Sequence, residues 1–213
     1  MVEFTTLGKW IEFILLFVVS ITIHEFAHAF TADRLGDDTP RSQGRVTLNP
    51  IDHIDPIGLA AMAISQLIGT GIGWGRPVMT NPRNFKHVRR DMMIVAFAGP
   101  FSNLLQAIVM ALPLRYGWVQ DGSNAERVLL DGVLLNCILL FFNMIPIGPL
   151  DGAKVLAGVL HEKDAEMFER FMRQFGIALF ILLITTHATR YIVMPPAAGL
   201  LSKLAPGYYV ELR

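Results

Sequence analysis

Long apolar runs dominate the order of residues along this chain. Four of them approach the roughly 20 residues that a helix needs to cross the hydrocarbon core of a membrane. They occupy residues 8–30, 92–114, 128–147 and 175–194. The second contains no charged residue, and the third carries only Asp131, near its start. The pattern therefore predicts an all-α polytopic membrane protein with about four transmembrane helices.

A fifth apolar run, residues 57–72, is shorter and is interrupted by glycines. Two similar short segments flank it, GRVTLNP at 44–50 and GRPVMTNP at 75–82. Each is typical of a short strand that ends in an Asn-Pro turn, although two surface loops fit the pattern equally well. We expect the fifth run to be a re-entrant or interfacial segment and the flanking segments to form a small β-strand pair.

The composition agrees with a membrane protein. Hydrophobic residues make up 53% of the chain and charged residues 17%, against about 25% charged residues in a typical soluble domain. Lys and Arg number 18, as do Asp and Glu, so no net charge attracts nucleic acid. The single cysteine, Cys137, excludes an internal disulfide. We expect a multi-pass protein of a bacterial or archaeal plasma membrane.

The sequence HEFAH at residues 24–28 places two histidines and a glutamate in the first apolar run. Residues i and i+4 of a helix share one face, so His24 and His28 can bind one metal ion while Glu25 polarises a water. The bare motif is only moderately specific. However, an ionisable residue at membrane depth costs about 2.5–3.5 kcal/mol on insertion scales, and a metal explains why three occur together.

A catalytic zinc site usually has three protein ligands and leaves a fourth position to water. Asp151 is a candidate for the third ligand because it ends the segment NMIPIGPLDG at 143–152, whose prolines break the helix. Irregular backbone at membrane depth is tolerated where it lines a cavity. An ordinary Asp-Gly turn at the membrane surface fits the pattern equally well, so spacing alone leaves this ligand open.

These motifs together resemble the site-2 protease family of intramembrane metalloproteases. HEFAH and NMIPIGPLDG carry the resemblance, since the second matches the family pattern N-x-x-P-x-x-P-L-D-G. The segment FAGPFSN at 97–103 is similar to the family's central-helix motif. The resemblance implies that one Zn²⁺ ion is held by His24, His28 and Asp151, that Glu25 is catalytic, and that the substrates are membrane proteins with a transmembrane segment.

We expect a compact family member, because the sequence leaves no room for an inserted PDZ domain. It would be a single membrane-embedded metalloprotease domain over residues 1–213. Its core would cover residues 8–155, and an amphipathic segment and the last transmembrane helix would follow in residues 156–200. Asn143 is a second candidate catalytic residue, as an oxyanion donor; hydrogen bonding at a broken helix end explains it equally well.

The positions of the ligands also constrain the topology. His28 and Asp151 each lie near the C-terminal end of an apolar run, so the ends of those two runs must reach the same depth. An even number of crossings must then separate them, and residues 57–72 should not cross. Basic residues cluster in the loop that follows, which the positive-inside rule places in the cytoplasm, together with the active site. They are Arg76, Arg83, Lys86, Arg89 and Arg90.

The sequence therefore predicts an intramembrane zinc metalloprotease that acts in regulated intramembrane proteolysis. A zinc transporter is an alternative, but the second apolar run offers only Asn103 and Gln106 as further ligands along a path. A metal-retaining membrane chaperone without hydrolytic activity is another. His53, between Asp52 and Asp55, is either a gating group near the site or a solvated loop residue.

Overall fold

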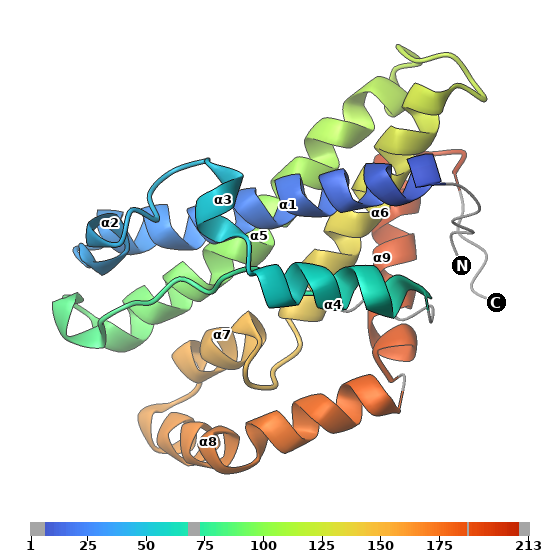
Figure 1. Cartoon of the computed structure of the whole chain (residues 1–213). Helices are drawn as coiled ribbons and strands as arrows, with labels where there is room; N and C mark the ends of the chain where they lie inside the picture. The colour runs from blue at the N-terminus through green and yellow to red at the C-terminus, as the bar shows by residue number, and fades with distance from the viewer. Residues whose placement is uncertain (1–6, 68–72, 187, 209–213) are drawn as a thin grey trace.

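The computed structural model describes residues 7–67, 73–186 and 188–208. Within these ranges the chain is helical, as Figure 1 shows. The elements in chain order are α1 (Leu7–Arg34), α2 (Thr39–Ser42), α3 (Pro50–His53), α4 (Pro56–Leu67), the 3-10 helix η1 (Pro82–Asn84), α5 (Val88–Arg115), α6 (Asn124–Asn143), α7 (Asp151–Val159), α8 (Glu162–Thr185) and α9 (Ala188–Leu204).

Helix α5 lies at the centre of the fold. It packs against α1, α6 and α7, and α9 packs against α6 (Figure 1). The interface of α5, α6 and α9 is built from small buried side chains, which let helix backbones approach closely. They include Ala107, Ala111, Val133, Cys137 and Ala197. The C-terminal end of α1 and the N-terminal end of α5 lie on the same side of the molecule, away from the turn that joins α5 to α6.

The prediction of about four transmembrane helices is wrong. Among the described residues, only α1 from Gly8 onward and α5 are individually long and apolar enough to cross a membrane. Helix α6 starts before the third apolar run and therefore adds Glu126 and Arg127 to Asp131, which lies within the run. The fourth run is divided between α8 and α9, which meet at 76°; counting this bent pair as one span gives three at most.

Helix α4 takes up the described part of the fifth apolar run. It has 12 residues and is therefore about 18 Å long, whereas the hydrocarbon core is about 30 Å thick. Helix α4 alone is too short to cross. Residues 68–72, the remainder of the run, lie outside the described residues.

The predicted β-strand pair is also wrong. The described part of the chain contains no strand, and a single antiparallel bridge joins Ile54 to Gly75. Side chains occupy the backbone groups that a ladder would need: the Arg45 guanidinium donates to the carbonyl oxygens of Arg76 and, at 3.1 Å, of Pro77. The Arg76 N–H donates to the carbonyl oxygen of His53 at 2.7 Å. Segment 75–80 is thus extended but is held mainly by a side chain and a helix end.

Candidate metal centre

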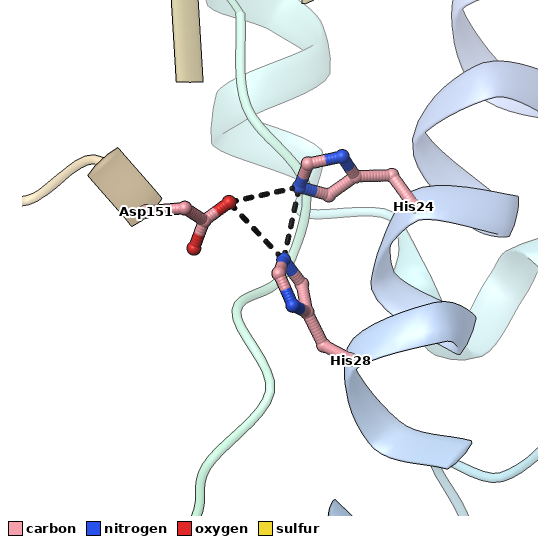
Figure 2. A group of neighbouring side chains, drawn as sticks. All are labelled: His24, His28 and Asp151. Carbon is pink, nitrogen blue, oxygen red and sulfur yellow. Dashed lines mark hydrogen bonds and ion pairs between the residues drawn. The ribbon is translucent and has the colours of Figure 1, made fainter. Parts of the chain in front are cut away.

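Three side chains from distant parts of the sequence meet between α1 and α7. The Nε2 atoms of His24 and His28 lie 3.0 Å apart. The Oδ2 atom of Asp151 lies 3.3 Å from the first and 3.2 Å from the second. Figure 2 shows the three groups pointing toward one another, the imidazoles from α1 and the carboxylate from the first residue of α7. Both histidines are buried.

The spacing of these atoms fits a zinc ion. Zinc binds nitrogen and oxygen ligands at about 2.0–2.1 Å, so two ligands at corners of a tetrahedron are separated by roughly 3.3 Å. The three observed separations are 3.0, 3.2 and 3.3 Å. Within the described residues, this is the one group of three or more His, Cys, Asp or Glu side chains close enough to share an ion.

The outer nitrogens of the imidazoles make the donor set suitable for a cation. His28 Nδ1 lies 2.7 Å from the carbonyl oxygen of Val95, which can only accept, so Nδ1 carries the proton. His24 Nδ1 donates to Oδ1 of Asn103, also at 2.7 Å. In the neutral rings both Nε2 lone pairs therefore face the Asp151 carboxylate. Three electron-rich atoms at this distance are stabilised by a metal ion between them.

Gly99 of α5 allows this approach. A Cβ at this position would lie 2.3 Å from His28 Nε2 and 2.7 Å from His24 Cε1, so any side chain would displace the imidazoles. Helix α5 thus contributes close contact through Gly99 as well as hydrogen bonds through Val95 and Asn103.

Asp151 is placed by a tight turn between α6 and α7. A Cβ on Gly152 would lie 2.3 Å from the carbonyl oxygen of Met144 and 2.5 Å from that of Ile145, so only glycine lets the chain fold back so closely. At the other end of α7, Arg89 donates to the carbonyl oxygens of Ala157, at 3.0 Å, and of Leu160. The turn and this helix cap together hold α7 against α5.

Glu25 lies beside the metal-ligand cluster and is buried. Its Oε2 accepts a hydrogen bond of 3.2 Å from the backbone N–H of Val78. The segment that supplies this N–H reaches α1 because Gly75 has no side chain; a Cβ there would lie 2.8 Å from Ile21 Cγ1 and 3.3 Å from Glu25 Cγ. The carboxylate is therefore held between α1 and segment 75–80.

Comparisons with known proteins identify the family of this chain. The family model for Peptidase family M50 matches residues 118–183, a region that contains Asn143 and Asp151. The Bacillus subtilis (strain 168) protein named "Putative zinc metalloprotease YwhC" is 35% identical over 190 residues, which cover 85% of this chain and 84% of that protein. The chain belongs to the M50 family of site-2 proteases. It is a metalloprotease.

Two further M50-type relatives bear the name Rip2 and are described as zinc metalloproteases in the same terms. That of Mycolicibacterium smegmatis is 30% identical over 185 residues, 85% of this chain and 69% of the relative. That of Mycobacterium tuberculosis (strain Erdman) is 32% identical over 182 residues, 82% and 68% respectively. No solved structure matches this M50 chain significantly. The relatives and the two long apolar helices identify an integral membrane protein.

In the structure of this M50 protease, the Asn143 side chain makes its hydrogen bond within its own helix, α6. Its Nδ2 donates to the carbonyl oxygen of Leu139, one turn earlier in α6, at 3.0 Å. This contact satisfies the end of the helix. A role in catalysis stays a prediction.

Sequence reasoning missed the parts played by Arg45 and His53 in this M50 chain. His53 is fully buried; its Nε2 donates to the carbonyl oxygen of Thr47 at 2.7 Å, and its Nδ1 faces Nη2 of Arg45 at 3.5 Å. Arg45 is 3% exposed. The two residues hold segment 75–80 in place, and this segment in turn contacts Glu25. The adjacent acidic residues favoured a solvated loop, and no spacing in the sequence signalled burial.

Proposed function

We propose that this M50 protease is an intramembrane zinc metalloprotease, which hydrolyses peptide bonds within or near transmembrane segments of membrane proteins. Such a reaction is the central step of regulated intramembrane proteolysis. The proposal rests on one observation. The ligand atoms of His24, His28 and Asp151 face a common point beside α1, a helix that is long and apolar enough to cross a membrane.

A single zinc ion would be held by His24, His28 and Asp151, and the fourth position would be left to water or substrate. When bound, zinc supplies a Lewis acid that lowers the pKa of a water molecule and polarises the scissile carbonyl. Glu25 takes the proton of the attacking water and passes it to the leaving amine. The Val78 N–H keeps this carboxylate in place.

Asn143 is proposed to donate a hydrogen bond to the developing oxyanion. Its amide would have to leave the carbonyl oxygen of Leu139, 3.0 Å away, when substrate binds. Such an interaction made only in the transition state raises the rate of the chemical step.

We propose a multi-pass arrangement in a bacterial plasma membrane, with the metal centre toward the cytoplasm. The loop that precedes α5 carries Arg76, Arg83 and Lys86, and Arg90 lies in the first turn of α5; all four are exposed. Positive charge next to a transmembrane helix favours the cytoplasmic side. Loops 35–49 and 73–87 would then share that side.

The transporter alternative has less support. A path across the membrane needs successive ligand sets, and the part of the chain that the structure describes offers one. A chaperone that keeps the metal without hydrolysis would use the same ligands, so only a test of Glu25 distinguishes it from a protease.

The proposal is tested with the purified chain, a panel of transmembrane peptides and a zinc chelator. We expect cleavage that chelator abolishes and added zinc restores. Glu25→Gln should lower the cleavage rate by about 100-fold or more while one zinc ion per chain remains, because general acid–base catalysis contributes 10²–10⁴-fold. Glu169→Gln, on the exposed face of α8, is the matched control and should cleave normally. Cleavage that survives the chelator rejects the proposal.

A further inference from the structure

A chain of buried polar side chains runs from the metal centre into the interface of α1, α5 and α6. Its members are His24, Asn103, Asn136 and Ser20, and the last three are fully buried. Burying an amide costs free energy unless all of its hydrogen bonds are made, so two such amides in an apolar helix bundle require an explanation.

The hydrogen bonds of this chain are continuous. His24 Nδ1 lies 2.7 Å from Asn103 Oδ1, and Asn103 Nδ2 lies 2.9 Å from Asn136 Oδ1. Asn136 Nδ2 in turn lies 3.0 Å from both the carbonyl oxygen of Gly132 and Oγ of Ser20. Each amide therefore uses its nitrogen on one side and its oxygen on the other.

The carbonyl oxygen of Gly132 sets the direction of the whole chain. A carbonyl can only accept, so the Asn136 amide must turn its nitrogen toward Gly132 and its oxygen toward Asn103. Asn103 must then turn its nitrogen toward Asn136 and its oxygen toward His24. The remaining partner, His24 Nδ1, has to donate. A backbone group of α6 thus decides which nitrogen of a ring on α1 carries the proton.

We propose that Asn103 and Asn136 are positioning residues, which form a relay that fixes the His24 tautomer and aims its Nε2 lone pair at the metal. The inference rests on the proposed zinc site. His28 achieves the same state in one step, through the carbonyl oxygen of Val95. Groups that hold the second nitrogen of a metal-bound imidazole orient the ring and raise its basicity. Asn136 extends this control to a residue that touches neither the ring nor the ion.

If the two amides served only to pack the helices together, a different result would be expected. Hydrogen bonds between helices that serve only packing would change thermal stability and leave zinc affinity alone. A relay predicts weaker zinc binding, and it predicts that the two asparagines depend on each other, because breaking either link frees His24.

The test measures zinc affinity of the full-length detergent-solubilised protein by competition with a chromophoric chelator. We expect Asn103→Leu to weaken binding by about 10- to 100-fold and Asn136→Leu by about tenfold. The double variant should bind within about twofold of Asn103→Leu, because residues that act in series are not additive. If Asn136→Leu fails to fold, Asn136→Ala replaces it.

Gln106→Leu is the matched control, since Gln106 is a buried amide one turn from Asn103 whose Nε2 reaches only the Ser20 carbonyl oxygen, at 3.4 Å. It should change the melting temperature without weakening zinc binding more than about twofold. Independently of any variant, ¹⁵N spectra of histidine-labelled, zinc-free wild type should show the His24 proton on Nδ1.

Three results overturn the relay: a folded Asn136 variant that binds zinc as tightly as wild type, equal weakening in the Gln106 control, or a His24 proton on Nε2. Failure of the wild type to bind zinc at all would instead reject the proposed function. The two failures are therefore distinguishable.

Discussion

The backbone N–H of Val78 donates a hydrogen bond of 3.2 Å to Oε2 of Glu25. This N–H belongs to segment 75–80, which is neither helix nor strand. Contacts with Arg45 and His53 hold the segment in place. Arg45 donates to the carbonyl oxygen of Pro77 at 3.1 Å, and the backbone carbonyl oxygen of His53 accepts from the Arg76 N–H at 2.7 Å. The position of the proposed general base thus depends on the Arg45 side chain, and on the His53 side chain through its Nδ1, which lies 3.5 Å from Nη2 of Arg45.

Replacing Arg45 or His53 by leucine should lower the cleavage rate and leave zinc affinity unchanged. Hydrogen bonds to charged groups contribute about 1.5–3 kcal/mol, so we expect losses of roughly 10- to 100-fold in kcat. Peptide cleavage and chelator competition measure the two quantities on the same samples. Arg41→Leu, whose guanidinium is exposed and pairs with Asp33, should behave as wild type. Loss of zinc in either variant would contradict a role confined to segment 75–80.

Gly99→Ala should disrupt the metal centre. The added Cβ would lie 2.3 Å from His28 Nε2, and the ring must move to relieve the contact. We expect zinc affinity to fall by about 5- to 150-fold, since forcing extra atoms into a packed interior costs about 1–3 kcal/mol. Gly199→Ala is the control, because a Cβ there meets nothing within 4 Å. Normal zinc binding by Gly99→Ala would show that the helices separate easily at this point.

At low pH the loop before α5 should lose the hydrogen bonds that it donates to Asp37. Burial alone would raise the pKa of the Asp37 carboxyl, but hydrogen bonds from Thr39, Asn81 and Asn84 outweigh it and hold that pKa below its usual value. A lowered pKa stabilises the fold above the ordinary value of about 3.9, and the stabilisation is lost as pH falls through the folded-state pKa.

Hydrogen exchange of the Asn81 amide, corrected for its intrinsic rate, measures this anchor. The amide should be protected from neutral pH down to about pH 4 and should exchange faster in more acidic solution. Asp37→Asn should make the Asn81 amide exchange faster already at pH 7. Asp38→Asn, at an exposed helix start without a side-chain cap, should not. Protection that is independent of pH would exclude Asp37 as the anchor.

Thiol labelling of variants that each gain one cysteine tests the topology. The native Cys137 is fully buried and should stay unlabelled. We expect Gln43→Cys and Lys86→Cys to react with an impermeant reagent only from the cytoplasmic side, and Asp121→Cys, beyond α5, only from the opposite side. These three positions are exposed. Labelling of positions 43 and 86 from different faces would reject the proposed arrangement.

Local spacing was enough to predict part of the candidate site. The interval between His24 and His28 puts both rings on one face of any helix, whatever surrounds it. Asp151 needed the resemblance of a ten-residue motif, because its approach to α1 depends on the turn at Gly152 and the packing of α7. The structure brings the three side chains together; their roles as ligands stay predictions.

The failures of the sequence analysis have identifiable causes. Segments 44–50 and 75–82 do have the composition of strands, but a pattern does not reveal that the Arg45 guanidinium takes the carbonyl oxygens that a strand partner would use. The number of spans was overestimated because apolar runs were treated as helices. Helix α6 begins four residues before its run, and the last run is divided between α8, which ends at Thr185, and α9, which begins at Ala188.

The residues of the relay had no sequence signal beyond being polar in apolar helices. In the sequence, Asn103 was a candidate for a further ligand on a transport path, and Asn136 indicated no role. Their meaning depends on which amide faces which carbonyl across three helices. Such a relationship exists only in the assembled bundle.

The positions of the two imidazole protons have a consequence for the membrane itself. In the proposed zinc-bound state, with Nδ1 protonated and Nε2 facing the ion, His24 and His28 would bring no charge to the site. The carboxylates of Asp151 and Glu25 would then match the charge of one divalent ion, and the proposed loaded centre would be electrically neutral. A neutral cluster avoids most of the solvation penalty that an isolated ion meets in a low-dielectric medium. The same protons that orient the proposed ligands would therefore let a helix carry the proposed chemistry inside a bilayer.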